Sequence, residues 1–399
     1  MGAPTLSSGH TANGVGPASA IRLLILGQLP PPYGGMEVMT EALVAGLRAE
    51  PRFVMTHINT QASRSLAEKG GKHQLRKSLR GALQTARLLD RIIRFRPRVI
   101  YLPLTSSSSF LGFLRDSLLI VPGMVCHKQI VVHLHNGVYA YTRTAGVKRR
   151  LVSAVLKRVS LAIVLGERLR SVFDGMVPPS RIACIPNGVD DRPFARARAR
   201  ITATPRADPR KRILFMGLMH REKGFHDLID TIPLVPDAEF VFAGEWPSST
   251  EEQQVHRVVR ERGVQDRTGF VGVITGEAKY DLFLSADIFV LPSYFEGQPV
   301  VVLEALAAGL PIVCTDCGAL NSAVKNGWNG FFVPRSNPGA LAARLNQLLG
   351  DDALRRSMGE HSRRLYEEEF TIERFVQRFA DAVEECAAGA GASAPAMRR

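Results

Sequence analysis

Residues 286–316 read ADIFVLPSYFEGQPVVVLEALAAGLPIVCTD, and the order of apolar and polar segments in this stretch decides the fold class. The runs IFVL and PIVCT have the length of buried strands, and the segment VVVLEALAAG between them has the length and composition of a helix. Two short strands joined by a helix form a parallel pair, because the crossover returns the second strand in the same direction. The stretch therefore predicts a parallel sheet covered by helices.

Two glutamates, Glu296 and Glu304, are the only charged residues between Tyr294 and Pro311. Glu296 lies in the loop after the first strand, and Glu304 lies a little over two helical turns further on, so both can face the same end of the sheet. Carboxylates accept paired hydrogen bonds from neighbouring hydroxyls, such as those of a ribose or a hexose. The alternative, two acids on a solvent-facing helix, is weakened by the apolar neighbours of Glu304, since a buried acid requires a partner.

The alternation of strands and helices continues on both sides of this stretch. Short apolar runs have the length of buried strands, and longer segments with apolar residues at helical spacing follow most of them. We expect further strands at Ala20–Gln28, Arg98–Leu104, Gln129–Gly137, Leu161–Glu167, 212–218 and 239–245, and helices at 36–50, 338–349, 354–370 and 372–387.

The length of 399 residues fits two domains rather than one core. A basic, proline-containing stretch that almost lacks large apolar residues, Ala195–Arg212, separates two copies of the strand and helix pattern. We predict a flexible tail at 1–20, an N-terminal domain at 21–195, a linker at 196–211, a C-terminal domain at 212–370, a helix at 371–387 that crosses back to the N-terminal domain, and a disordered tail at 388–399.

Composition excludes several classes of protein. Hydrophobic content of 45%, charged content of 22% and a mean hydropathy of +0.01 are typical of a globular chain. The most apolar segment, Phe110–Leu134, is interrupted by charged residues and a proline, so we expect no membrane span. The first 20 residues lack the basic start and apolar core of a secretion signal, which predicts a cytoplasmic location. Five cysteines are too few for a disulfide framework or a four-ligand zinc site.

Charge is distributed unevenly between the two halves of the chain. Residues 1–200 hold 29 Lys and Arg against 10 Asp and Glu, whereas residues 201–399 hold 22 against 27. Much of the excess lies in 69–98, where Leu75, Leu79, Leu83, Ala86, Leu89 and Ile93 recur at helical spacing. This basic amphipathic helix is either an ordinary surface helix or a contact for anionic lipid headgroups. Only one aromatic residue other than His73, Phe95, lies among these charges, which disfavours nucleic acid as a partner.

Two loops offer groups that bind phosphate. PPPYGGMEV, residues 30–38, joins a strand to a helix, and Gly34 and Gly35 would let a diphosphate approach backbone N–H groups at the positive helix end. The alternative for this loop is a simple turn. In the second half, Arg221 and Lys223 follow a strand and precede a helix, where they can reach a ligand held between the domains.

Together these segments resemble glycosyltransferase family 4 (group 1), whose members are retaining enzymes with the GT-B fold, two facing Rossmann-like domains and an interdomain cleft. PSYFEGQPVVVLEALAAGLPIVCTD resembles the E-x7-E signature of that family. Five further segments resemble family segments in order and spacing: PPPYGGMEV, VVHLHNG, IPNGVD, REKG and NGWNGFFVP. The resemblance covers roughly residues 21–385.

The resemblance implies a role for individual residues. Glu304 would hold the ribose hydroxyls of a nucleotide-sugar donor, Glu296 the transferred sugar, and Lys223 the diphosphate. His135 would lie near the sugar and the incoming hydroxyl, although a structural histidine beside His133 is the alternative. The backbone of Gly297, Gln298 and Pro299 would contact sugar and phosphate, that of Gly34 and Gly35 the diphosphate, and that of Val273 the base. Many relatives read G-R-L where this chain has Leu218, so the phosphate arginine is missing unless Arg221 replaces it.

The expected function is therefore a nucleotide-sugar-dependent transfer of a hexosyl or N-acetylhexosaminyl group to a lipid-linked or envelope polysaccharide precursor. No DxD pair lies at a strand end, so we expect no metal and no cofactor. Two alternatives stay open: a sugar-nucleotide epimerase or hydrolase on the same scaffold, and a catalytically silent relative that binds a nucleotide.

Overall fold

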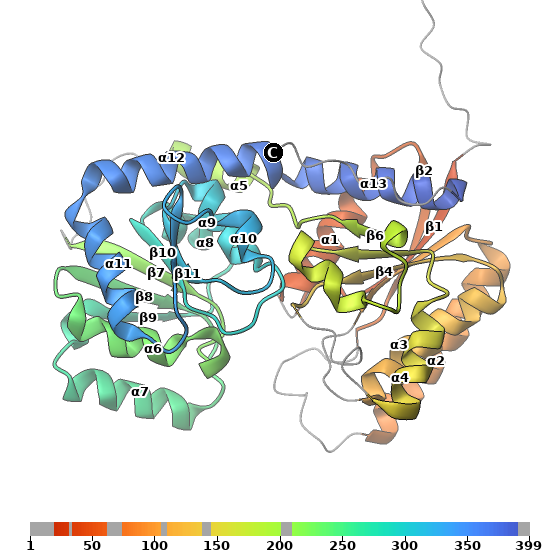
Figure 1. Ribbon diagram of the computed structural model, residues 1–399, viewed down its shortest axis with the longest axis horizontal. Coiled ribbons are helices and arrows are strands. Elements are labelled where there is room, and N and C mark those ends of the chain that lie inside the picture. Colours follow the sequence, from red (N-terminus) through yellow and green to blue (C-terminus); the bar gives the residue numbers. More distant parts are fainter. Residues whose placement is uncertain are drawn as a thin grey trace, which may run out of the picture.

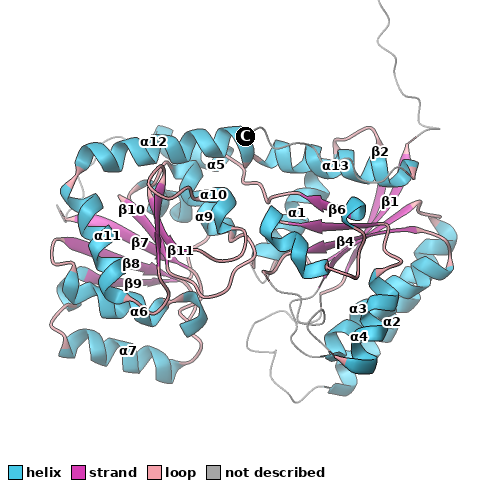
Figure 2. Ribbon diagram, in the orientation of Figure 1, coloured by secondary structure: helices cyan, strands magenta, loops and turns pink. Residues whose placement is uncertain are grey.

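A computed structural model describes residues 20–31, 34–61, 74–104, 110–137, 145–200 and 210–389, except the side chains of residues 74–80, 82, 110 and 111. The chain forms two α/β units that lie side by side, each built on a six-stranded parallel sheet (Figures 1 and 2). The two-domain α/β architecture predicted from the strand and helix pattern is confirmed.

The first sheet has the strand order β2-β1-β3-β4-β5-β6. Its strands are buried apolar runs, apart from β2, which lies at the edge and is only partly buried. Helices cover both faces of the sheet. The elements are β1 (Ile21–Gly27), α1 (Gly35–Arg48), β2 (Phe53–Asn59), α2 (Gln74–Arg94), β3 (Val99–Leu104), α3 (Phe110–Val125), β4 (Gln129–Leu134), α4 (Gly146–Leu156), β5 (Leu161–Val164) and β6 (Ile182–Cys184).

The second sheet has the order β12-β11-β10-β7-β8-β9, which is the doubly wound order with its reversal between β7 and β10. Cys314, which lies in the strand Ile312–Thr315, and Cys317 are both buried in the core of this unit. The elements are α5 (Arg192–Arg200), β7 (Lys211–Met216), α6 (Phe225–Thr231), β8 (Ala238–Ala243), α7 (Ser249–Glu261), β9 (Thr268–Gly272), α8 (Glu277–Leu284), β10 (Ile288–Leu291), α9 (Val300–Ala308), β11 (Ile312–Thr315), α10 (Leu320–Ala323), β12 (Gly330–Val333), α11 (Pro338–Gly350), α12 (Asp352–Glu369) and α13 (Ile372–Ala388).

The chain crosses between the two units twice, and the two crossings lie side by side. The Val189 N–H donates to Phe370 O at 2.8 Å, and the Ile372 N–H donates to Val189 O at 3.0 Å. Beyond the second crossing, Phe375 and Phe379 of α13 pack into the core of the first unit. Helices α12 and α13 therefore run end to end across both units (Figure 1).

The first crossing lies before the linker that the sequence led us to expect at 196–211. Residues 192–200 form α5, and Phe194 packs against Tyr280 and Phe283 in the second unit. The arginines of ARARAR hid this helix in the sequence, because its buried face is only Phe194 and Ala197. Residues 201–209 lie outside the described residues, as do 1–19 and 390–399, where tails were expected.

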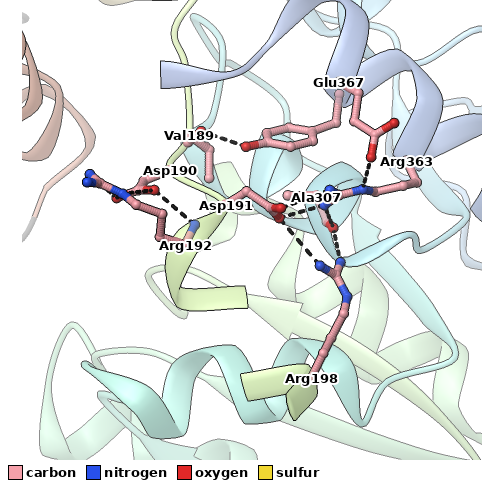
Figure 3. A network of polar contacts seen from close by, with 9 residues as sticks. Val189, Asp190, Asp191, Arg192, Arg198, Ala307, Arg363 and Glu367 are labelled. Atoms are coloured by element: carbon pink, nitrogen blue, oxygen red, sulfur yellow. Dashed lines mark hydrogen bonds and ion pairs between the residues drawn. The ribbon is translucent and has the colours of Figure 1, made fainter. Parts of the chain in front are cut away.

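A polar network fixes the region of the crossings (Figure 3). Arg363 of α12 forms a bidentate pair with Asp191, with Nη1–Oδ1 and Nη2–Oδ2 distances of 2.6 and 2.8 Å. Burial raises the pKa of the Asp191 carboxyl, but the hydrogen bonds and charge of Arg363 outweigh burial and hold that pKa below its usual range. The Tyr366 hydroxyl donates to Val189 O at 2.8 Å. The crossing is thus held by α12 of the second unit.

Helix α2 forms where the sequence predicted an amphipathic helix, but the face that packs on the sheet is not the predicted apolar stripe. Leu88 and Ile92 are buried in the core of the first unit, whereas Leu83, Leu89 and Ile93 of the predicted apolar stripe are exposed. The expected stripe therefore does not pack on the sheet along the described part of α2. Leu75 and Leu79 lie outside the residues whose side chains are described.

Candidate active site

The loops after β7 and β10 meet at the carboxyl ends of the second sheet, where its strand order reverses and ligands of such sheets bind. Glu222 O accepts hydrogen bonds from the Tyr294 N–H at 2.8 Å and the Ser293 hydroxyl at 3.0 Å. Gly224 has a φ of 69°, and a Cβ there would overlap the carbonyl oxygen of Pro292, so only glycine permits this approach. The two loops are thereby locked together.

This packing brings Lys223 to Glu296. The Lys223 Nζ lies 2.7 Å from Oε1 of Glu296, whose side chain is almost completely buried. A buried carboxylate is tolerated only with a partner, and the lysine supplies one. The sequence placed these two residues in one site, and the structure brings them together.

Glu304 lies on α9, and it is 4% exposed. The Nζ atom of Lys279, on α8, lies 2.6 Å from Oε1 of Glu304. Oε2 of the same carboxylate is buried and has no hydrogen-bond partner among the described residues. Sequence reasoning missed Lys279, because it lies 25 residues before Glu304 on a separate helix and carries no motif of its own. The carboxylate is thus held on one oxygen and able to accept a hydrogen bond on the other.

The first unit faces these acids with the loop after β4. A Cβ added to Gly137 would overlap the carbonyl oxygen of Glu296, and one added to Gly297 would overlap that of His135. Backbone therefore touches backbone between the two units. The contact places His135 beside the loop that carries Glu296.

His135 belongs to a buried aromatic cluster. Its ring centroid lies 4.0 Å from that of His133, and Nδ1 of His133 lies 3.0 Å from the Tyr101 hydroxyl. Burial lowers the pKa of His135 to about 4, so the ring is neutral at pH 7. Burial, and to a lesser degree repulsion from His135 when that ring is protonated, lowers the pKa of His133 well below its usual value. Nε2 of His135 is buried without a partner among the described residues, so one nitrogen can serve a ligand.

Gly34 and Gly35 lie at the start of α1, and a Cβ on Gly35 would be 3.7 Å from the side chain of Val300, the first residue of α9. The amino ends of α1 and α9 thus approach each other across the two units. The sequence interpretation overlooked Glu37, whose buried carboxylate lies against Gly34 and places a negative charge beside the expected diphosphate position. Residues 32 and 33 of this loop lie outside the described residues.

Gln298 was expected to contact the donor through its backbone, whereas its side chain forms hydrogen bonds within the protein. Its Oε1 accepts from the Asn187 N–H at 2.7 Å, and its carbonyl oxygen accepts from Asn187 Nδ2 at 3.1 Å. Its Nε2 donates to the Ser322 hydroxyl at 3.0 Å. Gln298 therefore joins the segment after β6 to the amino end of α9. Pro299 is the N-cap residue of that helix.

Three positions to which the sequence analysis gave a role in the donor site are exposed at its edge. Arg221 and Leu218 are exposed in the loop after β7. Val273 follows the end of β9 and is exposed as well. No contact in the described structure assigns Arg221 the task of the missing phosphate arginine.

The described residues contain no cluster of three or more His, Cys, Asp or Glu side chains that could hold a metal ion. Among the helices that the structure describes, none combines the length and apolar character needed to cross a bilayer.

Two facing parallel-sheet units with paired acids and lysines at the strand ends define a glycosyltransferase of the GT-B class. Residues 33–192 match the model of Glycosyltransferase Family 4, and residues 198–365 match that of Glycosyl transferases group 1. The chain belongs to this family, as the sequence motifs indicated.

The chain is also similar to individual proteins. An uncharacterized glycosyltransferase of Methanocaldococcus jannaschii is 33% identical over 36% of this chain and 37% of its own length. Spore coat protein SA of Bacillus subtilis is 26% identical over 64% of this chain and 72% of its own length. The crystal structure of Anabaena HepE in complex with UDP has a TM-score of 0.69 at 16% identity, over 92% of this chain and 100% of that one, and shows the shared fold.

Proposed function

We propose that this glycosyltransferase moves a hexosyl or N-acetylhexosaminyl group from a nucleotide-sugar donor to an acceptor hydroxyl, with retention at the anomeric carbon. The observation that carries this proposal is the carboxylate of Glu304, which is buried, fixed by Lys279 on Oε1 and unpartnered on Oε2. A buried acceptor atom without a partner is costly, and a ribose hydroxyl would satisfy it. HepE, a protein of the same fold, has been crystallised with UDP-glucose.

The remaining residues take roles around this anchor. Lys223 neutralises charge that develops on the leaving diphosphate, while the amino ends of α1 and α9 supply backbone N–H groups. Glu296 accepts hydrogen bonds from the transferred sugar. Neutral His135 lies where the acceptor hydroxyl would approach and can exchange a hydrogen bond through Nε2.

The proposed step needs no protein nucleophile. The bond between the anomeric carbon and the diphosphate oxygen breaks, the acceptor oxygen bonds to that carbon on the same face, and the leaving diphosphate takes the acceptor proton. The protein supplies positioning and electrostatic stabilisation, with lysine side chains and helix ends in place of a metal ion.

We propose that the acceptor is a lipid-linked or envelope polysaccharide precursor, and that the enzyme acts at the cytoplasmic side of the membrane. The excess of basic residues in the first half of the chain, concentrated in α2 and the segment before it, supports contact with an anionic membrane.

Substitution of Glu304 tests the donor assignment. Glu304→Ala should abolish binding of the sugar nucleotide and transfer, whereas Glu367→Ala, on the exposed side of α12, should leave both intact. Transfer at the unchanged rate in Glu304→Ala would refute the assignment. Incubation with the donor alone separates the alternatives, because a hydrolase or an epimerase would convert the donor without an acceptor.

A further inference from the structure

Helix α3 is apolar on two faces. Phe113, Leu119 and Ile120 pack in the core of the first unit. On the opposite side Leu114, Leu118, Val121 and Val125 follow one another at intervals of four, three and four residues, and each is exposed, Leu118 by 55% and Val125 by 70%. A helical stripe at this spacing forms one continuous surface. Contiguous exposed apolar surfaces of this kind usually mark a site of interaction with a protein or a membrane.

The neighbouring helices extend this surface. Helix α2 packs beside α3 and exposes Leu83, Leu89 and Ile93, the last by 70%. Helix α4 packs on the other side of α3 and exposes Val147 and Leu151. Figure 1 shows the three helices next to one another on the outer side of the first unit. We call the set of exposed apolar residues on α2, α3 and α4 the apolar face.

Exposed basic residues lie on the same helices as the apolar face. Arg87 and Arg91 are exposed on α2, and residues 148–150 of α4, KRR, are exposed as well. Asp90 is the only acidic residue in α2, and its carboxylate pairs with Arg94; α4 contains none. Exposed apolar side chains and basic residues on the same helices match a bilayer with anionic headgroups.

A cationic depression of about 430 Å³ lies where α2 and α3 end, next to the most exposed residues of the apolar face. Its lining contains no acidic residue and consists of Arg22, Arg96, Pro97, Arg98, His127, Lys128, Gln129 and Ala387. Nε of Arg22 donates to Arg96 O at 2.9 Å, and Arg98 donates to Ala387 O, so two guanidinium groups are held in place.

The backbone at the depression is unusual. Arg96 and His127 have φ angles of 50° and 52°, the left-handed conformation that glycine adopts most readily and that commonly ends helices. An arginine and a histidine occupy both positions although glycine would relieve the strain. These two helix ends bring Arg96 and His127 to the lining of the depression.

We propose that the apolar face and the cationic depression form one docking surface for an anionic lipid bilayer, in which the depression binds the phosphate of a lipid headgroup. This docking proposal rests on the proposed function in one respect: docking at a membrane would bring the enzyme to a lipid-linked acceptor. The apolar side chains enter the boundary between headgroups and acyl chains, and the cations hold the phosphates.

Co-sedimentation of the full chain with vesicles of phosphatidylcholine, with and without phosphatidylglycerol, tests the proposal. The unchanged chain should bind the anionic vesicles, and high salt should weaken binding. Arg96→Gly combined with Lys128→Gln should lower binding about 25-fold, because each cation near the surface contributes roughly a factor of five. Relief of the left-handed strain should keep the melting temperature of this variant at least as high as that of the unchanged chain.

Ser336→Gly is the matched control, since Ser336 has a φ of 51° in the second unit, away from this surface. It should bind vesicles as the unchanged chain does. Leu118→Ser combined with Val125→Ser tests the apolar face and should also lower binding at least tenfold. Displacement from vesicles by millimolar inorganic phosphate would identify phosphate as the recognised group.

Binding of anionic vesicles by both double variants at the unchanged affinity would overturn the proposal. A chain that forms dimers through this face and ignores vesicles would overturn it as well. UDP-induced thermal stabilisation, measured on each variant, reports on the donor site alone and therefore separates failure of docking from failure of the proposed transfer.

Discussion

The Nζ atom of Lys279 lies 2.6 Å from Oε1 of Glu304, while Oε2 of that carboxylate is buried without a partner among the described residues. The ion pair leaves one oxygen of a fixed carboxylate for a ligand. Lys279 therefore acts as a positioning residue in the proposed donor site, because its ammonium group holds the Glu304 carboxylate in one orientation. No sequence motif marks Lys279.

Lys279→Met should lower both the affinity for UDP and the free energy of unfolding. Removal of the lysine leaves Glu304 buried without its cation, which we expect to cost about 1–3 kcal/mol of stability, less than for a fully buried pair because Lys279 is partly exposed. Affinity for UDP should fall about tenfold, a change of 1.4 kcal/mol. Urea unfolding and calorimetric titration with UDP measure the two effects.

Lys211→Met is the control for this prediction, because Lys211 pairs with exposed Asp352 at 3.8 Å and such surface pairs contribute little to stability. It should leave UDP affinity unchanged. Equal affinities for UDP in Lys279→Met and the unchanged chain would show that Lys279 does not position Glu304.

Gln298→Met should destabilise the contact between the segment after β6 and α9. The substitution leaves the buried N–H of Asn187 without its acceptor, which costs about 1–3 kcal/mol in the free energy of unfolding. Gln347→Met provides the comparison, since exposed Gln347 makes one hydrogen bond with Arg344. If both variants lost the same small amount of unfolding free energy, the Gln298 hydrogen bonds would not stabilise the fold.

Much of the fold could be predicted from the sequence, because fully buried parallel strands appear as continuous apolar runs. β1, β3, β4, β7, β8 and β10 all follow this rule. β2, β6 and β9 were not predicted. β2 and β9 are partly buried edge strands, and β6 has three residues. Helix α5 was hidden by its arginines, since two buried residues are too few to produce a periodic signal.

The candidate site was predictable only in part. Four site residues lie in segments that resemble the family in order and spacing along the chain, so the sequence predicted them: Glu296, Glu304, Lys223 and His135. Lys279 lies in no segment that resembles the family. Asn187 and Glu37 do lie within IPNGVD and PPPYGGMEV, but their contacts at the site depend on tertiary packing that those segments do not reveal. The unpartnered Oε2 of Glu304 is likewise a property of packing, so no sequence pattern could show it.

Removal of divalent metal should leave transfer unaffected. In the proposed mechanism Lys223 and the amino ends of α1 and α9 stabilise the leaving diphosphate, so a metal ion is not needed to neutralise its charge. Initial rates measured in EDTA and in magnesium should be equal within error. A rate that falls to background in EDTA and returns with magnesium would contradict this mechanism.

The stability of the fold should decrease as the pH falls below about 6.5, in part because His133 and His135 are buried as neutral rings. Both residues have lower pKa values in the folded chain than in the unfolded chain, where an ordinary value of about 6.5 applies. Above pH 6.5 both histidines make their full contribution to the free energy of unfolding. As the pH falls from 6.5 to about 4, the folded pKa of His135, the contribution of His135 is lost progressively.

His135→Asn isolates the share of one ring. The unfolded chain binds one proton more than the folded chain for each such histidine, which corresponds to about 1.4 kcal/mol per pH unit. The slope of the unfolding free energy against pH between 6 and 5, measured by urea unfolding, should therefore be smaller by about that amount in His135→Asn than in the unchanged chain. Identical slopes in the two proteins would mean that His135 is protonated within the fold, and its proposed role as a neutral hydrogen-bond partner of the acceptor would fail.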